Sequence, residues 1–147
     1  MSSTHTLLNY HVIFGTKNRI ACIPTTWRAP LYDYIGGVIR GLEGKPKGIG
    51  GTADHVHILM ELRPTHQLCS VVREIKKATS KWIHHEHNYF DFAWQEGYAA
   101  FTASITSLQA LQTYISHQEI HHSHKSFIDE LREIYEKAGI EYDERFL

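Results

Sequence analysis

The sequence has few cysteines and no long apolar run. Its 147 residues include only Cys22 and Cys69, which are far apart and not in a metal-type spacing, so we expect free thiols in a reducing compartment. No apolar segment approaches the roughly 20 residues that a membrane-spanning helix needs. The "MSSTHTLLNY" start also lacks the charged-then-apolar order of a signal peptide. These absences favour a cytoplasmic protein that is not inserted in a membrane.

An excess of one charge is absent too. The formal net charge is −1, so bulk charge gives no argument for nucleic-acid binding, and a site for a polyanion would have to be local. Low-complexity segments are lacking, and 42% hydrophobic with 21% charged residues is typical of a folded protein. We therefore expect one domain over residues 1–147, with a core of about 4–124 and a C-terminal helical tail of about 125–147.

The apolar patterns predict the order β-α-β-β-α-β followed by two helices. Strand patterns occupy about 10–14, 45–52, 54–62 and part of 92–104. Helical patterns occupy about 27–42, 66–87, 107–122 and 126–139. Thr25 or Thr26 is the expected N-cap of the first of these helices. This order predicts a ferredoxin-like split βαβ fold of the α+β class. An antiparallel sheet would carry two helices on one face, and the C-terminal helices would carry a tyrosine.

A pair of histidines stands out in "DHVHILMEL", residues 54–62. Strand alternation puts His55 and His57 on one face and an apolar set on the other. With 12 histidines in the chain, about one H-x-H pair is expected by chance, and the sequence has more. This pair lies on an apolar strand predicted to be central, and a rigid strand can preorganise a metal site. Two histidines leave positions for a third ligand from elsewhere.

A tyrosine lies on the predicted helix 107–122. Tyr114 and Gln118 are four residues apart, so the phenol and the amide would project from one helical face. The simpler interpretation is that Tyr114 extends the packing stripe and Gln118 is solvated. A tyrosine with a pKa near 10 is a poor nucleophile at neutral pH, but it can attack a phosphodiester that a divalent metal has polarised.

These segments together resemble the HUH single-tyrosine transposases, which are insertion-sequence enzymes and their REP-associated relatives. In that family histidine-hydrophobic-histidine is the namesake motif. The similarity covers nearly the whole chain through "YHVIFGTKNR", "DHVHILMEL", "FAWQEGYAAF", "TYISHQEIHH" and "FIDELREIYEKAGIEYDERFL".

The resemblance implies a mechanism and a set of site residues. His55 and His57 match the metal pair, Gln118 the third ligand and Tyr114 the nucleophile. Mg²⁺ or Mn²⁺ would bind the scissile phosphate of single-stranded DNA. Attack by the tyrosine would give a 5′-phosphotyrosine link and a free 3′-hydroxyl, so rejoining needs no ATP. The resemblance also implies hairpin recognition and a homodimer, often with the tyrosine helix of one subunit completing the site of the other.

Basic residues offer candidate DNA contacts. Four of them recur at helical spacing on the predicted second helix, and two follow the first strand. By itself such a row is usually a solvated helix face, but beside a phosphodiester site it suits a groove for the DNA backbone. The predicted contacts are Lys17, Arg19, Arg73, Lys76, Lys77 and Lys81.

Other functions remain open. The protein could be a domesticated relative that processes repeated palindromes, or a nucleic-acid-binding protein without cleavage activity. A histidine-rich metal sensor is a further alternative, because His117, His121 and His124 share a helical face. We interpret the acidic C-terminal segment, which includes Glu130, as a docking helix.

Overall fold

Four strands form one antiparallel sheet in the computed structural model, which describes residues 3–147. They are β1 (Leu8–Gly15), β2 (Lys45–Gly51), β3 (His55–Leu62) and β4 (Ala99–Thr102), and their order across the sheet is β2-β3-β1-β4. Every neighbouring pair is antiparallel, so β3 lies between two partners. This order confirms the predicted ferredoxin-like α+β fold.

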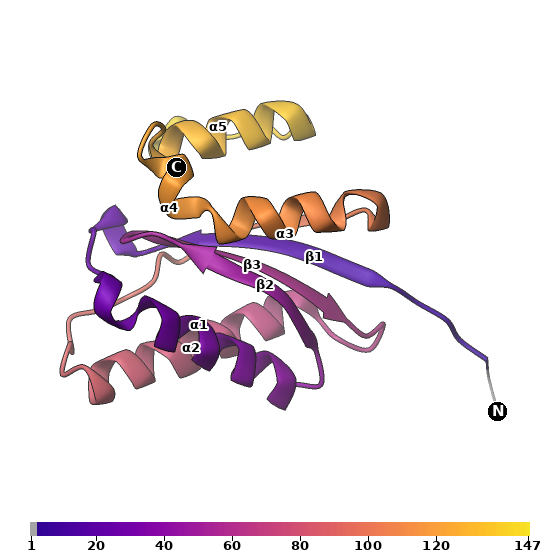
Figure 1. The fold of residues 1–147 in the computed structure, drawn as a ribbon, viewed down its shortest axis with the longest axis horizontal. Helices are drawn as coiled ribbons and strands as arrows, with labels where there is room; N and C mark the ends of the chain where they lie inside the picture. The colour runs from indigo at the N-terminus through magenta and orange to yellow at the C-terminus, as the bar shows by residue number, and fades with distance from the viewer. Residues whose placement is uncertain (1–2) are drawn as a thin grey trace.

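Two helices cover the apolar face of the sheet. They are α1 (Thr25–Gly41) and α2 (Leu68–Glu86), which lie together beneath the strands in Figure 1. Val56, Ile58 and Met60 of β3 point to this side and are completely buried. They pack in one apolar core with side chains of both helices. The alternation of β3 therefore works as predicted on this face.

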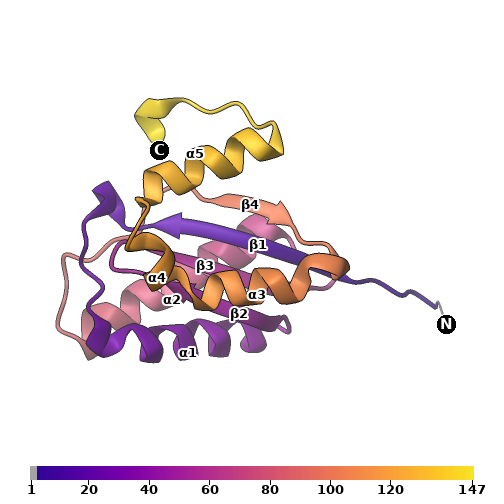
Figure 2. The same cartoon turned by 45° about the horizontal axis from the view of Figure 1, so that its top comes forward.

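Three shorter helices cover the opposite face. They are α3 (Leu108–Ser116), α4 (Gln118–His122) and α5 (Phe127–Ala138), which lie above the sheet in Figure 1; in Figure 2, where the top comes forward, α3 and α4 pass in front of the strands. Gly50 of β2 allows this packing, because a Cβ atom there would lie 2.2 Å from the carbonyl oxygen of Ile115. The end of α3 can therefore approach the backbone of β2 closely.

Three predicted boundaries differ from the structure. The expected helix 107–122 is interrupted at His117, whose φ of −102° and ψ of 21° separate α3 from α4. The expected strand within 92–104 contains only Ala99–Thr102, and Trp94 adds one isolated bridge to Thr16. The N-cap of α1 is Pro24, which makes no side-chain cap bond, so the threonines after it are already helical.

Short 3₁₀ helices complete the described chain. They are η1 (Lys17–Arg19), η2 (Ile105–Ser107) and η3 (Glu144–Phe146). Cys22 and Cys69 are free thiols, as predicted. Among residues 3–147, no helix combines the length and the apolar character needed to cross a membrane.

Candidate active site

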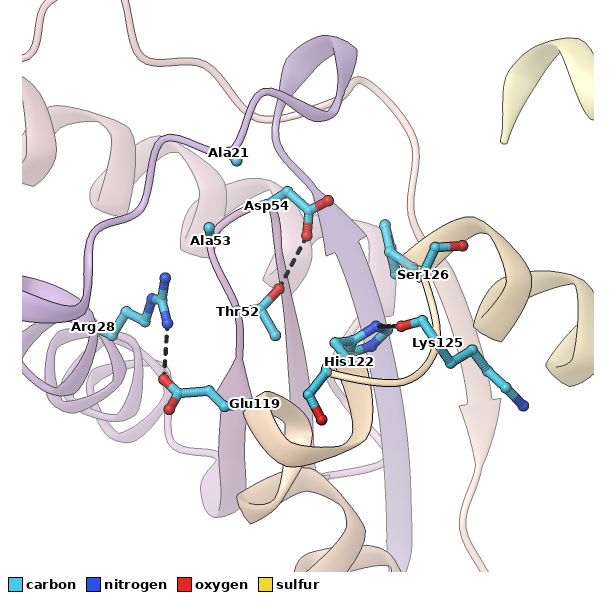
Figure 3. A pocket seen from close by; sticks show the side chains of 11 residues that line it. Ala21, Arg28, Thr52, Ala53, Asp54, Glu119, His122, Lys125 and Ser126 are labelled. Atoms are coloured by element: carbon cyan, nitrogen blue, oxygen red, sulfur yellow. Dashed lines mark hydrogen bonds and ion pairs between the residues drawn. The ribbon is translucent and has the colours of Figure 1, made fainter.

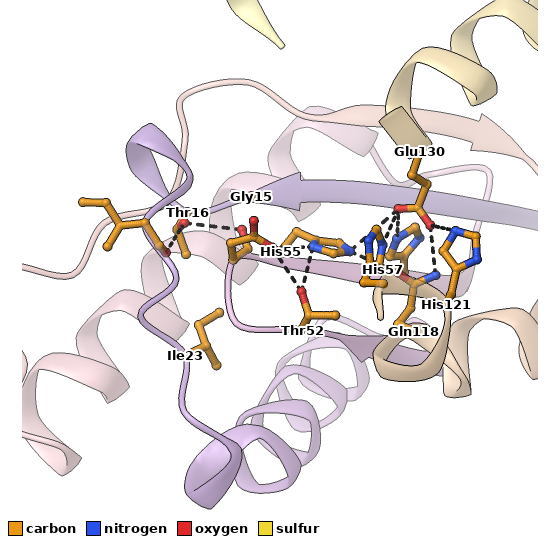
Figure 4. Close-up of polar contacts among 12 residues, drawn as sticks. Gly15, Thr16, Ile23, Thr52, His55, His57, Gln118, His121 and Glu130 are labelled. Carbon is orange, nitrogen blue, oxygen red and sulfur yellow. Dashed lines mark hydrogen bonds and ion pairs between the residues drawn. The ribbon is translucent and has the colours of Figure 1, made fainter. Parts of the chain in front are cut away.

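Both histidines of β3 are fixed through their Nδ1 atoms. His55 Nδ1 lies 2.8 Å from the Asp54 carboxylate and 3.1 Å from the Thr52 hydroxyl, and His57 Nδ1 lies 2.8 Å from His11 Nε2. Both imidazoles are completely buried. Because a carboxylate or a second ring holds the far side of each imidazole, its Nε2 atom is directed towards the helices above the sheet, as Figure 4 shows.

The interruption at His117 places Gln118 and Tyr114 on successive helices. Gln118 Oε1 lies 3.0 Å from His55 Nε2, and the Gln118 amide nitrogen donates to Glu130 Oε2 at 3.2 Å. The Tyr114 ring stands edge-on to the His57 ring at 5.7 Å between centroids, and its hydroxyl donates to Glu130. The four residues predicted for the site therefore meet within one chain.

Glu130 of α5 lies at the centre of this group. Its Oε1 atom is 3.0 Å from His57 Nε2 and 3.1 Å from His122 Nε2. Its Oε2 atom is 3.3 Å from His121 Nε2. The carboxylate side chain is only 2% exposed, although it belongs to the acidic segment that we interpreted as a docking helix. The helix does dock on the sheet, but this one acidic residue enters the site.

A sequence signal for Glu130 existed. Phe127, Glu130 and Leu131 share one helical face through their i, i+3 and i+4 spacing, and all three are buried. An acidic residue inside an apolar stripe needs a buried partner, because burial of an unpaired charge is costly. The abundance of acidic residues around it concealed this position.

Burial and close contacts set the charges of the site. Burial lowers the pKa of His57 to about 4 and that of His11 to about 3. Burial alone would raise the pKa of Glu130, but the imidazoles of His122 and His57 hold it well below its usual range. Burial, together with the bond to Glu130, raises the pKa of the Tyr114 phenol above its ordinary value. At neutral pH the site therefore combines an ionised carboxylate, the neutral imidazoles of His57 and His11, and a protonated phenol.

The contact between His55 and Gln118 fits a metal ion. The Asp54 carboxylate can only accept, and its pKa is held low by its bond with His55 against the opposing effect of burial, so His55 Nδ1 carries a hydrogen. His55 Nε2 then presents a lone pair to the Gln118 oxygen at 3.0 Å. Two acceptors at this distance repel each other unless a proton or a metal ion lies between them. Adjacent ligands of an octahedral metal are about 3 Å apart.

One group of potential metal ligands occurs among residues 3–147. It comprises His55, His57, His122 and Glu130, and their donor atoms lie within 4.8 Å of one another. The alternative cluster of His117, His121 and His124 does not form such a group in the described part of the chain. The metal-sensor alternative therefore lacks the cluster on which it depended.

An open pocket of about 430 Å³ adjoins this group. Asp54, His122 and Lys125 line it, and Arg28 and Glu119 form an ion pair of 2.9 Å along its wall, as Figure 3 shows. Both Asp54 and His122 also contact the buried His55: the Asp54 carboxylate is hydrogen-bonded to its ring, and the His122 ring packs edge-on against it. The pocket therefore leads from the surface to the edge of the site.

The predicted DNA contacts lie in two places. Arg73, Lys76, Lys77 and Lys81 belong to α2, on the face of the sheet opposite the histidines, whereas Lys17 and Arg19 form η1. The Arg19 guanidinium lies 5.8 Å from the centre of the Phe127 ring, beside the site.

Lys76 differs from its neighbours on α2. Its ammonium group donates to the carbonyl oxygens of Gln95, Glu96 and Gly97 at 2.8, 3.2 and 2.7 Å. It therefore helps to hold the segment between the Trp94 bridge and β4 in place.

Comparisons with known proteins bear on the fold and the family. The structure is similar to that of a candidate transposase from Deinococcus radiodurans R1, with a TM-score of 0.62 and 22% identity over 80% of this chain and 98% of that chain. It is also similar to a REP-associated tyrosine transposase bound to a REP hairpin, with a TM-score of 0.60 and 20% identity over 83% of this chain and 74% of that chain. No curated protein gives a match. These structures share the fold, and because the family model for IS200-like transposases matches residues 4–118, the chain belongs to the IS200-like transposase family.

Proposed function

We propose that the protein is a metal-dependent transposase of single-stranded DNA in which Tyr114 is the nucleophile. His55, His57 and Gln118 would hold Mg²⁺ or Mn²⁺. The observation that carries this proposal is the meeting of a half-buried phenol with a buried amide and two buried imidazoles, with the phenol against His57. A protein that only bound DNA would not need to bring these four groups together.

The chain's own residues account for the reaction as follows. The Tyr114 oxygen forms a bond to the scissile phosphorus, the bond from phosphorus to the 3′-oxygen breaks, and the phenolic proton is released while the 3′-oxygen gains a proton. The products are a 5′-phosphotyrosine link and a 3′-hydroxyl. One phosphoester bond replaces another, so reversal rejoins the strand without ATP. A bound divalent ion supplies stabilisation of the charge on the phosphate oxygens. Glu130 accepts the phenolic hydrogen bond and thereby orients Tyr114.

DNA binding would use the basic residues in both places. Arg19 lies beside the site against Phe127, and Lys17 belongs to the same short helix η1. Arg73, Lys77 and Lys81 add positive charge along α2, on the other face of the sheet. The donors of Lys76 are bonded to three carbonyl oxygens, so we assign this lysine to holding the segment before β4 and not to a phosphate contact. Hairpin-bearing single-stranded DNA is the first substrate to test, because a structurally similar transposase was solved with a REP hairpin.

A covalent complex tests the nucleophile. We expect the full-length protein, incubated with hairpin-bearing single-stranded DNA and Mn²⁺, to form a protein–DNA adduct that survives denaturation. Tyr114→Phe and excess chelator should each abolish the adduct, whereas Tyr98→Phe, which changes an exposed tyrosine outside the site, should retain it. An adduct of equal yield in Tyr114→Phe would exclude Tyr114 as the nucleophile.

Complementation tests the proposed homodimer. If two subunits share their sites, a mixture of Tyr114→Phe and His57→Asn proteins should form adducts that neither variant forms alone. If each chain uses its own tyrosine, as the contacts within this chain favour, the mixture should stay inactive.

A domesticated relative that processes repeated palindromes would be an enzyme and would form the same adduct. The second candidate of a different class is a nucleic-acid-binding protein without cleavage activity. Hairpin binding is the property that it would share with the similar structure, which was solved with a REP hairpin. This candidate predicts salt-sensitive binding of hairpin DNA that chelator leaves unchanged, and no adduct with any substrate.

A further inference from the structure

We infer that Glu130 and His122 complete the metal site, so that a carboxylate from the C-terminal helix binds the ion together with His55 and His57. This inference rests on the proposed metal-dependent function. Both added residues lie beyond residues 4–118, the span that matches the family model. The family match therefore gives no information about these two residues.

The two oxygens of Glu130 face different groups. Oε1 faces the imidazoles, at 3.0 Å from His57 Nε2 and 3.7 Å from His55 Nε2. Oε2 faces the Tyr114 hydroxyl and the Gln118 amide nitrogen. One oxygen is therefore placed to bind an ion while the other holds the nucleophile, which links the two parts of the site.

His122 repeats the arrangement seen at His55. Its Nδ1 atom lies 2.6 Å from the carbonyl oxygen of Lys125, which can only accept, so Nδ1 carries the hydrogen in the neutral ring. Its Nε2 atom is buried without a hydrogen-bond partner, yet it lies 3.1 Å from Glu130 Oε1. Burial alone would lower the pKa of His122, but this contact with Glu130 raises it. A cation bound to both atoms can take the place of the proton that they would otherwise share.

The first turns of α5 hold the carboxylate in place. The Ser126 hydroxyl caps the helix by accepting from the Asp129 amide. The Phe127 ring stacks on His55, with 3.9 Å between centroids and an interplanar angle of 6°. Leu131 is buried in the small apolar cluster on this face of the sheet. A ligand supported in this way is preorganised, as a metal site requires.

Mn²⁺ binding by the metal-free protein tests the inference, measured by calorimetry and by the spin resonance of free Mn²⁺. Loss of a residue that only supports a metal ligand typically weakens binding by about 10- to 100-fold, so loss of a ligand should cost at least about tenfold. We expect Glu130→Gln and His122→Phe to weaken binding by at least that factor. Glu133→Gln on the exposed side of α5 is the matched control and should bind as the wild type does.

Metal binding by His57→Asn and Glu130→Gln separates failure of this inference from failure of the proposed function. If His57→Asn loses binding while Glu130→Gln keeps the wild-type affinity, the carboxylate is not a ligand and this inference fails while the proposed function stands. If His57→Asn also binds as the wild type does, the metal site of the proposed function fails with it. Circular dichroism shows whether each variant folds. Should Glu130→Gln unfold, Glu130→Asp keeps the charge but withdraws the oxygens, and wild-type affinity in that variant would overturn the inference.

Discussion

The two faces of β3 are built from alternate residues of one strand, yet different interactions fill them. On the α1 and α2 side, Val56, Ile58 and Met60 bury apolar surface that needs no particular partner. On the other side, His55 and His57 each contact specific polar groups on two sides of the ring. The comparison indicates that the apolar face supplies the stability of the fold. This stability allows the histidine face to hold hydrogen-bond acceptors, such as His55 Nε2 and Gln118 Oε1, close together where a metal ion could bind both.

The largest expected effect comes from the apolar face. Ile58→Ala should lower the free energy of unfolding by about 2–5 kcal/mol, because it removes buried methyl groups from a packed core. Denaturant titration measures this loss. Mn²⁺ should still raise the melting temperature of the folded variant. A variant that keeps wild-type stability would contradict the division of roles between the faces.

The adjacent residue should show the opposite behaviour. His57→Asn should change metal-free stability less than Ile58→Ala does, but it should abolish the stabilisation by Mn²⁺. For the wild type that stabilisation is about 2.7 kcal/mol at a metal concentration 100 times the dissociation constant. Thermal melts with Mn²⁺ or with chelator measure it. An equal metal response in His57→Asn would remove the polar face as the metal site.

The fold and the histidine pair of the site could be predicted from the sequence, each from a different pattern. The apolar alternation of β3 and the stripes of α1 and α2 are local patterns, so element order and topology could be predicted from them. His55 and His57 were visible because both lie on that strand.

Tyr114 and Gln118 were predicted from their spacing and the family resemblance, but the other residues of the site depend on tertiary contacts. His11 meets His57 across 46 positions, and Glu130 across 73. Residues so far apart in the sequence leave no local pattern that would predict their contact. The interruption at His117 contains no glycine or proline to announce it, although it changes how Gln118 reaches the site. Sequence reasoning therefore predicted the strand half of the site better than the helical half.

Acid should reveal the polar face in the metal-free protein. His11 has a pKa of about 3 in the folded protein against 6.5 when unfolded, so between these values only the unfolded chain binds the proton. As pH falls from 7 to 5, His11 should remove about 2 kcal/mol of stability. His11→Gln cannot titrate, so its stability should fall less steeply over this range.

Denaturant titrations at several pH values in chelator measure the difference. His5→Gln changes an exposed residue that precedes β1 and serves as the control, with the wild-type slope expected. If His11→Gln and the wild type lose stability in parallel, His11 is not kept neutral by its burial against His57.

The smallest effects should separate two lysines on α2 that are adjacent in sequence. Lys77 is exposed, so Lys77→Met should leave stability unchanged and reduce the salt dependence of DNA binding by about one ion, as loss of one phosphate contact does. Lys76→Met should do the reverse, because the Lys76 ammonium group bonds three carbonyl oxygens before β4. Fluorescence anisotropy with hairpin DNA over a range of salt concentrations measures the first effect, and denaturant titration the second. Equal salt dependence in Lys77→Met and the wild type would place the DNA away from α2 and confine it to the face that carries the histidines.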